Sequence, residues 1–516
     1  MRRFSVAAIA ALVVALSAWR LLAATAGLEV TTATLDGLPV TVMAPVAVGD
    51  DAPGIVVAHG FAGSRQLMRS FGVSLARHGY VVGLPDLAGH GANAMPLDRE
   101  GDVLRDDVLR VRELLVERHR VADTRVVMLG HSMGSGAVMR AGIERPDAVA
   151  GVIAVSPIDA DVSEQLPRDL QLLAGSLEGR FVANAQDLLA RAGGPGGTPG
   201  TDGTARRLEI ITGVEHVTIL FSPRAQATAA GWADRVIGQD PGDFRSVGLI
   251  GWWLAALLGV IALWRAVVPS LAPVQGRAAE DGKPSTDIRS DVPDLPETTG
   301  VAGRRSVIGA VVGALVATAL LAVVGRQVAL GGLGGMLVGP ALMLWFALAG
   351  LAWGWIVTGQ PGGAVSRELA RPTGRDALGV AVLTIVLTAA FGALAPLAWL
   401  AAVPGPSRAL YVLPFAVLML PWTLPMAAGL QDRTGWRTVG WWVTTSTALL
   451  LGVGTAAFVV PGIGFVLLLL PLLPPLVGLL VAVLAPWVRR TGQVWGAGVA
   501  AALFLGWITA VLFPLS

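Results

Sequence analysis

A serine flanked by glycines is the residue of this sequence best placed for chemistry. Gly130-His131-Ser132-Met133-Gly134 directly follows the apolar run 125–129 and precedes a stretch of helical composition, 135–143. Small flanking residues let the backbone make a tight, strained turn between a strand and a helix, and such a turn exposes the serine hydroxyl. This context predicts that Ser132 is a nucleophile.

A second loop could stabilise the negative charge that attack by a serine produces. The apolar run 54–58 leads into His59-Gly60-Phe61-Ala62-Gly63-Ser64. In acyl-transfer enzymes of this architecture, such a loop supplies one backbone N–H to the oxyanion, and the residue after the serine supplies the other. The expected donors are the N–H groups of Phe61 and Met133.

Three segments carry a resemblance to a known family: HGFAGS at 59–64, PDLAGHG at 85–91 and GHSMGS at 130–135. Together they resemble the α/β-hydrolase superfamily, in the neighbourhood of lidless esterases, dienelactone hydrolases and serine aminopeptidases. The resemblance covers roughly residues 35–240. It implies a catalytic triad whose members follow one another as serine, acid and histidine.

His216 is the histidine that this order allows. The sequence has six histidines, and only His216 follows Ser132. It comes shortly after the apolar run 208–211, where the last strand of such a fold delivers its base. We therefore predict that His216 deprotonates Ser132.

The triad acid has more than one candidate. Glu178 follows the run 169–175 with the spacing Gly-x-x-Glu, at which related sheets place their carboxylate, and it would hold the imidazole in its reactive tautomer. Asp159 and Asp161, just past the preceding strand, are alternatives, and Glu215 adjoins the histidine. Glu178 is the favoured acid.

Short apolar runs alternate with helical stretches over residues 29–245, and this alternation predicts the fold that positions the site. Four runs are rich in β-branched residues: 54–58, 80–84, 125–129 and 151–155. Such continuous runs are typical of strands buried on both faces. We expect an α/β domain with a mostly parallel sheet and helices on both faces. No stretch between residues 156 and 169 is long enough for a lid domain, so the site should be open to small or membrane-proximal acyl substrates.

The remainder of the chain is far more apolar and should be an all-α polytopic transmembrane domain. Eight stretches have about the ~20 apolar residues that a bilayer requires: 247–264, 306–325, 333–357, 378–402, 409–430, 438–460, 463–487 and 494–514. We expect a transmembrane helix within 246–266, a polar cytoplasmic loop at 267–305 and a seven-helix region at 306–516.

Residues 1–28 form either a signal anchor or a cleaved signal peptide, with Arg2 and Arg3 before an apolar run. Basic residues in short loops indicate the orientation. With a cytoplasmic N-terminus, the outer short loops hold Arg326 and Arg408, whereas the inner set is much larger: Arg2, Arg3, Arg265, Arg277, Lys283, Arg289, Arg304, Arg305, Arg367, Arg371, Arg375, Arg433, Arg437, Arg489 and Arg490. We expect an integral membrane protein with its α/β domain extracytoplasmic.

Composition excludes several other kinds of protein. The sequence has no cysteine, which rules out thiolate catalysis, disulfides and cysteine-based zinc sites. A net charge of +2 is too small to indicate the basic surface that nucleic-acid binding requires. No metal or cofactor motif is present. The sequence predicts a membrane-bound serine hydrolase acting on an acyl or ester substrate, with a lipid as one option. The alternatives are an acyltransferase or lipid-handling protein that uses the same domain, and a non-catalytic binding module on a membrane scaffold.

Overall fold

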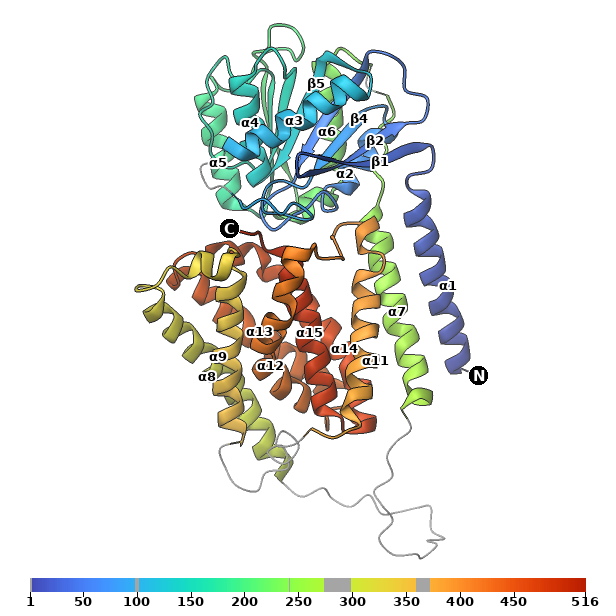
Figure 1. Cartoon of the computed structure of the whole chain (residues 1–516), viewed down its shortest axis with the longest axis vertical. Helices are drawn as coiled ribbons and strands as arrows, with labels where there is room; N and C mark the ends of the chain where they lie inside the picture. The colour runs from blue at the N-terminus through green and yellow to red at the C-terminus, as the bar shows by residue number, and fades with distance from the viewer. Residues whose placement is uncertain (1, 98–101, 241, 273–297, 359–371) are drawn as a thin grey trace, which may run out of the picture.

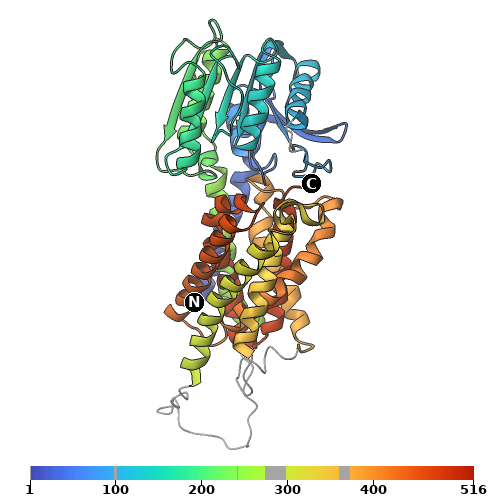
Figure 2. The same ribbon diagram turned by 90° about the vertical axis from the view of Figure 1, so that its left-hand side faces the viewer.

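The protein has two parts, a domain built on an eight-stranded sheet and a bundle of long apolar helices that includes the N-terminal one (Figure 1). The computed structural model describes residues 2–97, 102–240, 242–272, 298–358 and 372–516. The two halves lie end to end, with the sheet domain at one end of the helices (Figure 2).

The sheet has the strand order β1-β2-β4-β3-β5-β6-β7-β8. Its strands are β1 (Leu28–Leu35), β2 (Leu38–Pro45), β3 (Ala52–Ala58), β4 (Val81–Pro85), β5 (Val121–His131), β6 (Gly151–Val155), β7 (Leu170–Gly175) and β8 (Arg206–Ile211). Strands β1 and β2 form an antiparallel hairpin that pairs antiparallel with β4, and the other pairs are parallel. The four predicted strands correspond to β3 to β6, which confirms the expected fold class.

Five helices cover the two faces of the sheet: α2 (Arg69–Arg77), α3 (Asp102–Arg118), α4 (Met133–Glu144), α5 (Gly179–Arg191) and α6 (Pro223–Val236). Successive strand residues point to opposite faces, so neighbouring buried side chains join different cores. Ile55 belongs to the core beneath α2 and α6, whereas Val56 belongs to the core beneath α3, α4 and α5. Because both faces are covered, the central strands are apolar at almost every position.

The apolar helices are α1 (Arg2–Ala23), α7 (Leu249–Leu271), α8 (Thr298–Val324), α9 (Gly339–Thr358), α11 (Asp376–Gly392), α12 (Pro406–Ala428), α13 (Trp436–Val459), α14 (Leu473–Thr491) and α15 (Val494–Leu512). We call them the bundle, together with the 3-10 helices η2 (Leu330–Gly335), η3 (Ala395–Leu397) and η4 (Gly464–Leu472). Within the described ranges, nine helical segments are long and apolar enough to cross a membrane. Nine such helices indicate an integral membrane protein.

The first and second helices of the bundle lie side by side. A Cβ placed on Gly259 of α7 would be 2.8 Å from the Val14 side chain of α1, so the glycine allows close approach. The guanidinium of Arg20 lies over the ring of Trp252 at 5.1 Å from its centroid. The N-terminal segment therefore packs as a partner of α7.

The expected polar loop at 267–305 falls largely outside the described residues, which exclude 273–297. Its first residues continue α7 to Leu271, and its last ones belong to α8, which begins at Thr298.

Candidate active site

Ser132 lies in a sharp turn between β5 and α4. Its backbone has φ 51° and ψ −117°, a conformation that side-chain-bearing residues rarely adopt. Strain of this kind costs about 1–3 kcal/mol and persists where the surrounding structure enforces it. The turn ends β5 at His131 and begins α4 at Met133, and it presents the Ser132 hydroxyl at the carboxyl end of the strand.

The two glycines of the motif are required by close backbone contacts. A Cβ on Gly130 would lie 2.1 Å from the carbonyl oxygen of Gly134, and a Cβ on Gly134 would lie 2.5 Å from the carbonyl oxygen of His59. Moving the first oxygen would shift the turn, and moving the second would shift the loop after β3. The spacing Gly-x-Ser-x-Gly therefore reflects how tightly the turn packs on the loop after β3.

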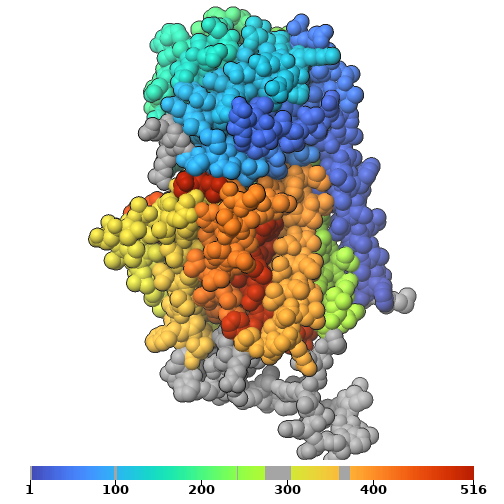
Figure 3. All heavy atoms as spheres, viewed as in Figure 1, coloured from blue at the N-terminus to red at the C-terminus, as the bar shows by residue number. Residues whose placement is uncertain are grey.

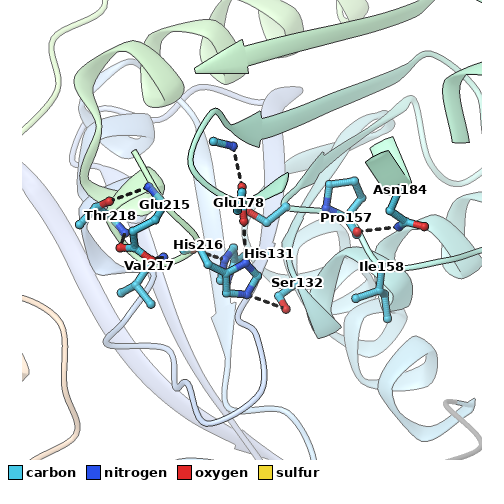
Figure 4. Close-up of polar contacts among 12 residues, drawn as sticks. His131, Ser132, Pro157, Ile158, Glu178, Asn184, Glu215, His216, Val217 and Thr218 are labelled. Atoms are coloured by element: carbon cyan, nitrogen blue, oxygen red, sulfur yellow. Dashed lines mark hydrogen bonds and ion pairs between the residues drawn. The ribbon is translucent and has the colours of Figure 1, made fainter. Parts of the chain in front are cut away.

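His216 bridges the serine and a carboxylate (Figure 4). Its Nε2 lies 3.0 Å from Ser132 Oγ, and its Nδ1 lies 2.8 Å from Glu178 Oε2. The facing carboxylate favours a proton on Nδ1, which leaves Nε2 to accept the hydrogen bond from the serine hydroxyl. Phe181 stacks on the imidazole with ring centroids 4.1 Å apart. The structure brings together the three side chains that the sequence singled out.

Glu178 is held by two further hydrogen bonds. Its Oε1 accepts from the backbone N–H of Gly175 at 2.6 Å and from the hydroxyl of Ser156 at 2.7 Å. With Oε1 engaged in this way, Oε2 faces His216. Ser156 was missed from the sequence, although its position at the end of β6, the neighbour of β5, was a usable signal.

The other acid candidates lie elsewhere. Asp159 pairs with Arg191 at the surface, and Asp161 is exposed. Glu215 accepts hydrogen bonds from the backbone N–H groups of Val217 and Thr218, so it caps its own loop. None of the three bonds His216.

The loop after β3 lies directly against the serine. A Cβ on Gly60 would be 2.8 Å from His131 Nδ1 and 3.1 Å from the Cβ of Ser132, so a side chain here would force the loop or the turn to shift. Phe61 and Met133 both line a cavity beside the serine. Over the described residues, neither backbone N–H donates to another protein group. Both groups therefore remain available to an oxygen atom of a bound molecule.

Two buried histidines brace these loops. His59 accepts a hydrogen bond at Nε2 from the N–H of Leu87, and His131 Nε2 donates to the carbonyl oxygen of His216. Burial lowers the pKa of His59 and holds the pKa of His131 well below its usual value, the latter with help from the nearby imidazole of His216. Both side chains are thus kept neutral.

Within the described ranges, no three His, Cys, Asp or Glu side chains are grouped so that they could hold a metal ion. The arrangement of Ser132, His216 and Glu178 suits nucleophilic attack assisted by a base, with the base oriented by a carboxylate.

Comparisons with known proteins concern the sheet domain. Residues 51–202 match the family model described as Hydrolase_4, serine aminopeptidase, S33. A structure of dienelactone hydrolase from Anabaena variabilis is 18% identical with a TM-score of 0.31, over 41% of this chain and 99% of that one. An S-formylglutathione hydrolase from Agrobacterium tumefaciens is 15% identical with a TM-score of 0.33, over 40% and 95%. No curated protein sequence matches the chain.

Proposed function

We propose that the α/β-hydrolase domain of this chain makes it a membrane-bound serine hydrolase, of the carboxylesterase or lipase type, that cleaves an ester-like acyl substrate. The observation that carries the proposal is the position of His216, within hydrogen-bond distance of both Ser132 and Glu178. A base oriented in this way can deprotonate a serine hydroxyl and hold the resulting positive charge.

The reaction proceeds in two steps. Ser132 Oγ attacks the carbonyl carbon of the ester while its proton passes to His216 Nε2. The tetrahedral intermediate collapses, the C–O bond to the alcohol breaks, and the alcohol leaves with the proton from Nε2. Water then attacks the acyl-enzyme with His216 as base, which releases the carboxylic acid and restores the Ser132 hydroxyl.

The backbone N–H groups of Phe61 and Met133 stabilise the oxyanion in both steps. Each such donor is commonly worth about 3–4 kcal/mol in the transition state, because it is already oriented and needs no reorganisation. Glu178 keeps the imidazole in its reactive tautomer and stabilises the imidazolium.

We propose that the hydrolase domain lies on the extracytoplasmic side and the N-terminus in the cytoplasm. The asymmetry of basic residues between the two sets of short loops supports this orientation. The close packing of α1 on α7 favours a retained signal anchor over a cleaved signal peptide.

Labelling with a fluorophosphonate probe tests the activity, since such probes react covalently with activated serines. We expect the full-length protein to be labelled, and the Ser132→Ala variant to give no band. Ser176→Ala is the matched control, because Ser176 is an exposed serine that directly follows β7, and β6 separates β7 from β5 in the sheet. It should be labelled like the wild type.

Absence of labelling on well-folded wild-type protein would instead favour a non-catalytic binding module. A band that persists in Ser132→Ala would move the nucleophile to another residue.

A further inference from the structure

A cavity of about 400 Å³ lies beside Ser132, where the hydrolase domain meets the bundle. Pockets for small ligands commonly fall between about 300 and 1,000 Å³. The hydrolase side of the cavity includes Phe61 and Met133, whose N–H groups we assign to the oxyanion. The bundle side consists of Gly331, Leu337, Val338, Gly462 and Phe465.

The bundle side of this cavity is formed by two connections between apolar helices, one between α8 and α9 and the other between α13 and α14. The two connections contact each other at glycines. A Cβ on Gly462 would lie 2.8 Å from the Cα of Gly331, so the two backbones are in direct contact. Gly462 also has a φ of +84°, which favours glycine. The N–H of Val338 donates to the carbonyl oxygen of Gly331 at 3.0 Å. This wall is therefore a defined structure.

The wall is also fixed to the hydrolase domain through the C-terminal residues. The N–H of Leu515 donates to the Gly89 carbonyl oxygen at 2.9 Å, and its own carbonyl oxygen accepts from the N–H of Leu97 at 2.9 Å. On the other side, the N–H of Leu337 donates to the carbonyl oxygen of Pro514 at 2.8 Å. Figure 3 shows these C-terminal residues, in red, along the boundary between the two halves.

A buried arginine adds a further connection. Arg408 of α12 is 2% exposed, and its guanidinium donates to the carbonyl oxygens of Gly89, Ala510 and Phe513. Gly89 belongs to the loop after β4, which lies at the same edge of the sheet as the serine. Hydrogen bonds thus join the loops of the hydrolase domain to the ends of the apolar helices.

Phe465 connects the cavity to the interior of the bundle. Its ring lies 4.4 Å from that of Phe61, centroid to centroid. Four residues further along η4, Leu469 lines a second cavity of about 80 Å³, which is walled by apolar side chains of α9, α12, α13, α14 and α15. An apolar surface therefore extends along η4 from inside the bundle to the residue beside the oxyanion.

We propose that the cavity between Phe61 and Phe465 binds the acyl chain of a membrane lipid ester, and that Phe465 determines the chain lengths accepted. The proposal rests on the function proposed above and assigns its substrate class. The absence of a lid insertion predicted an open site, but the bundle forms one of its walls. The carbonyl group would lie at Ser132, with the acyl chain directed toward the bundle.

The chemistry of the lining favours this occupant. Apart from Arg140, the side chains that line the cavity are apolar, and burial of each methylene group improves binding by about fourfold. A short acyl group would leave the bundle side unfilled. The candidate membrane spans place this wall within reach of a lipid that enters from the bilayer.

Chain-length profiles of the full-length protein in lipid nanodiscs test the proposal. We would compare kcat/KM for p-nitrophenyl butyrate, octanoate, laurate and palmitate. Phe465→Trp should reduce kcat/KM for laurate and palmitate by about tenfold or more, because the larger ring takes up space at the bundle side of the cavity, and leave butyrate within about twofold. Phe465→Leu should shift the preference toward longer esters.

Phe458→Trp is the matched control, because Phe458 is also in the bundle but is 78% exposed. It should leave the profile unchanged. If both Phe465 variants keep the wild-type profile and still react with the fluorophosphonate, the acyl chain binds elsewhere and the proposal is wrong, whereas the serine hydrolase assignment stands. If the wild-type protein does not react with the fluorophosphonate, both the acyl-chain proposal and the serine hydrolase assignment are wrong.

A crosslinking experiment needs no variant. A long-chain fluorophosphonate with a diazirine at the end of its chain would attach to Ser132 and then crosslink to its surroundings on illumination. We expect crosslinked peptides from 330–338 or 460–470. Crosslinks confined to the sheet domain would overturn the proposal. If a long-chain ester is turned over equally fast with and without a surrounding bilayer, the acyl donor is a water-soluble molecule. That result would also overturn the proposal.

Discussion

The site depends on a few side chains whose positions are set by hydrogen bonds. Glu178 is 7% exposed and uses Oε1 to bind Gly175 and Ser156, so only Oε2 is left for His216. Ser132 and His216 are buried as well, at 6% and 4% exposure. A charge placed in such surroundings acts strongly on its neighbours, because little water screens it.

Replacing the carboxylate should therefore impair catalysis without disturbing the fold. Glu178→Gln keeps the shape of the side chain but removes the charge that holds the imidazole tautomer. We expect kcat on a p-nitrophenyl ester to fall by about 10³–10⁴-fold, and circular dichroism to be unchanged. Glu178→Asp keeps the charge on a shorter side chain, so its kcat should fall less than that of Glu178→Gln.

Asp159→Asn is the control for this experiment, because Asp159 forms only an exposed pair with Arg191. Its kcat should remain within about twofold of the wild type. Full activity in Glu178→Gln, or a large loss in Asp159→Asn, would contradict the assignment of the acid.

Much of this site was predictable at the residue level because its signals are local. Ser132 lies in a motif with a distinctive turn, and His216 is the only histidine that follows it. Ser156 was missed although its position directly after β6 was a usable signal, because its contact with Glu178 depends on the pairing of β6 with β7. Phe465 was not predicted either, since nothing distinguishes it from other apolar residues within an apolar run.

At the scale of elements, the site forms where the parallel strands end. The turn after β5, the loop after β3 and the loop after β7 meet at one edge of the sheet, and β8 leads to His216. The alternating pattern predicted β3 to β6 because these strands are buried on both faces. The hairpin of β1 and β2 was not predicted, because β1 is largely exposed and carries polar residues such as Thr31 and Thr32.

The turn around Ser132 should not tolerate a side chain at its flanking glycines. In Gly134→Ala, the added methyl group would lie 2.5 Å from the carbonyl oxygen of His59. We expect a loss of about 1–3 kcal/mol in the free energy of unfolding, together with much slower fluorophosphonate labelling, because the turn must shift. Thermal unfolding and labelling rates would measure the two effects.

Gly231→Ala provides the comparison within the same domain. Gly231 lies inside helix α6, where an added Cβ meets only Arg235 at 3.6 Å. This variant should gain up to about 1 kcal/mol, because alanine favours a helix. If Gly134→Ala and Gly231→Ala have the same free energy of unfolding and the same labelling rate, the close contacts around the turn do not restrict position 134.

At the scale of the whole molecule, the hydrolase domain is attached to the bundle at both of its ends. Helix α1 ends at Ala23 and β1 begins at Leu28, while α6 ends at Val236 and α7 begins at Leu249. Between these attachments, the loops at the carboxyl ends of the strands contact the ends of the apolar helices. The sequence predicted the two parts from their composition, but not that the edge of the sheet that carries Ser132 faces the bundle.

The proposed orientation can be measured with introduced cysteines, since the sequence has none of its own. A membrane-impermeant maleimide added to right-side-out vesicles should label Thr198→Cys, an exposed position of the hydrolase domain. It should label Arg375→Cys, at an exposed loop before α11, only after the vesicles are permeabilised. The reverse pattern would place the hydrolase domain in the cytoplasm.

The double attachment of the hydrolase domain also determines how this protein would encounter a lipid. An enzyme that cannot leave the bilayer plane meets its substrate by lateral diffusion in two dimensions. Its turnover would then follow the mole fraction of substrate in one leaflet and would fall as inert lipid is added, even at constant bulk concentration. The composition of the surrounding leaflet, more than the volume of the compartment, would set its rate.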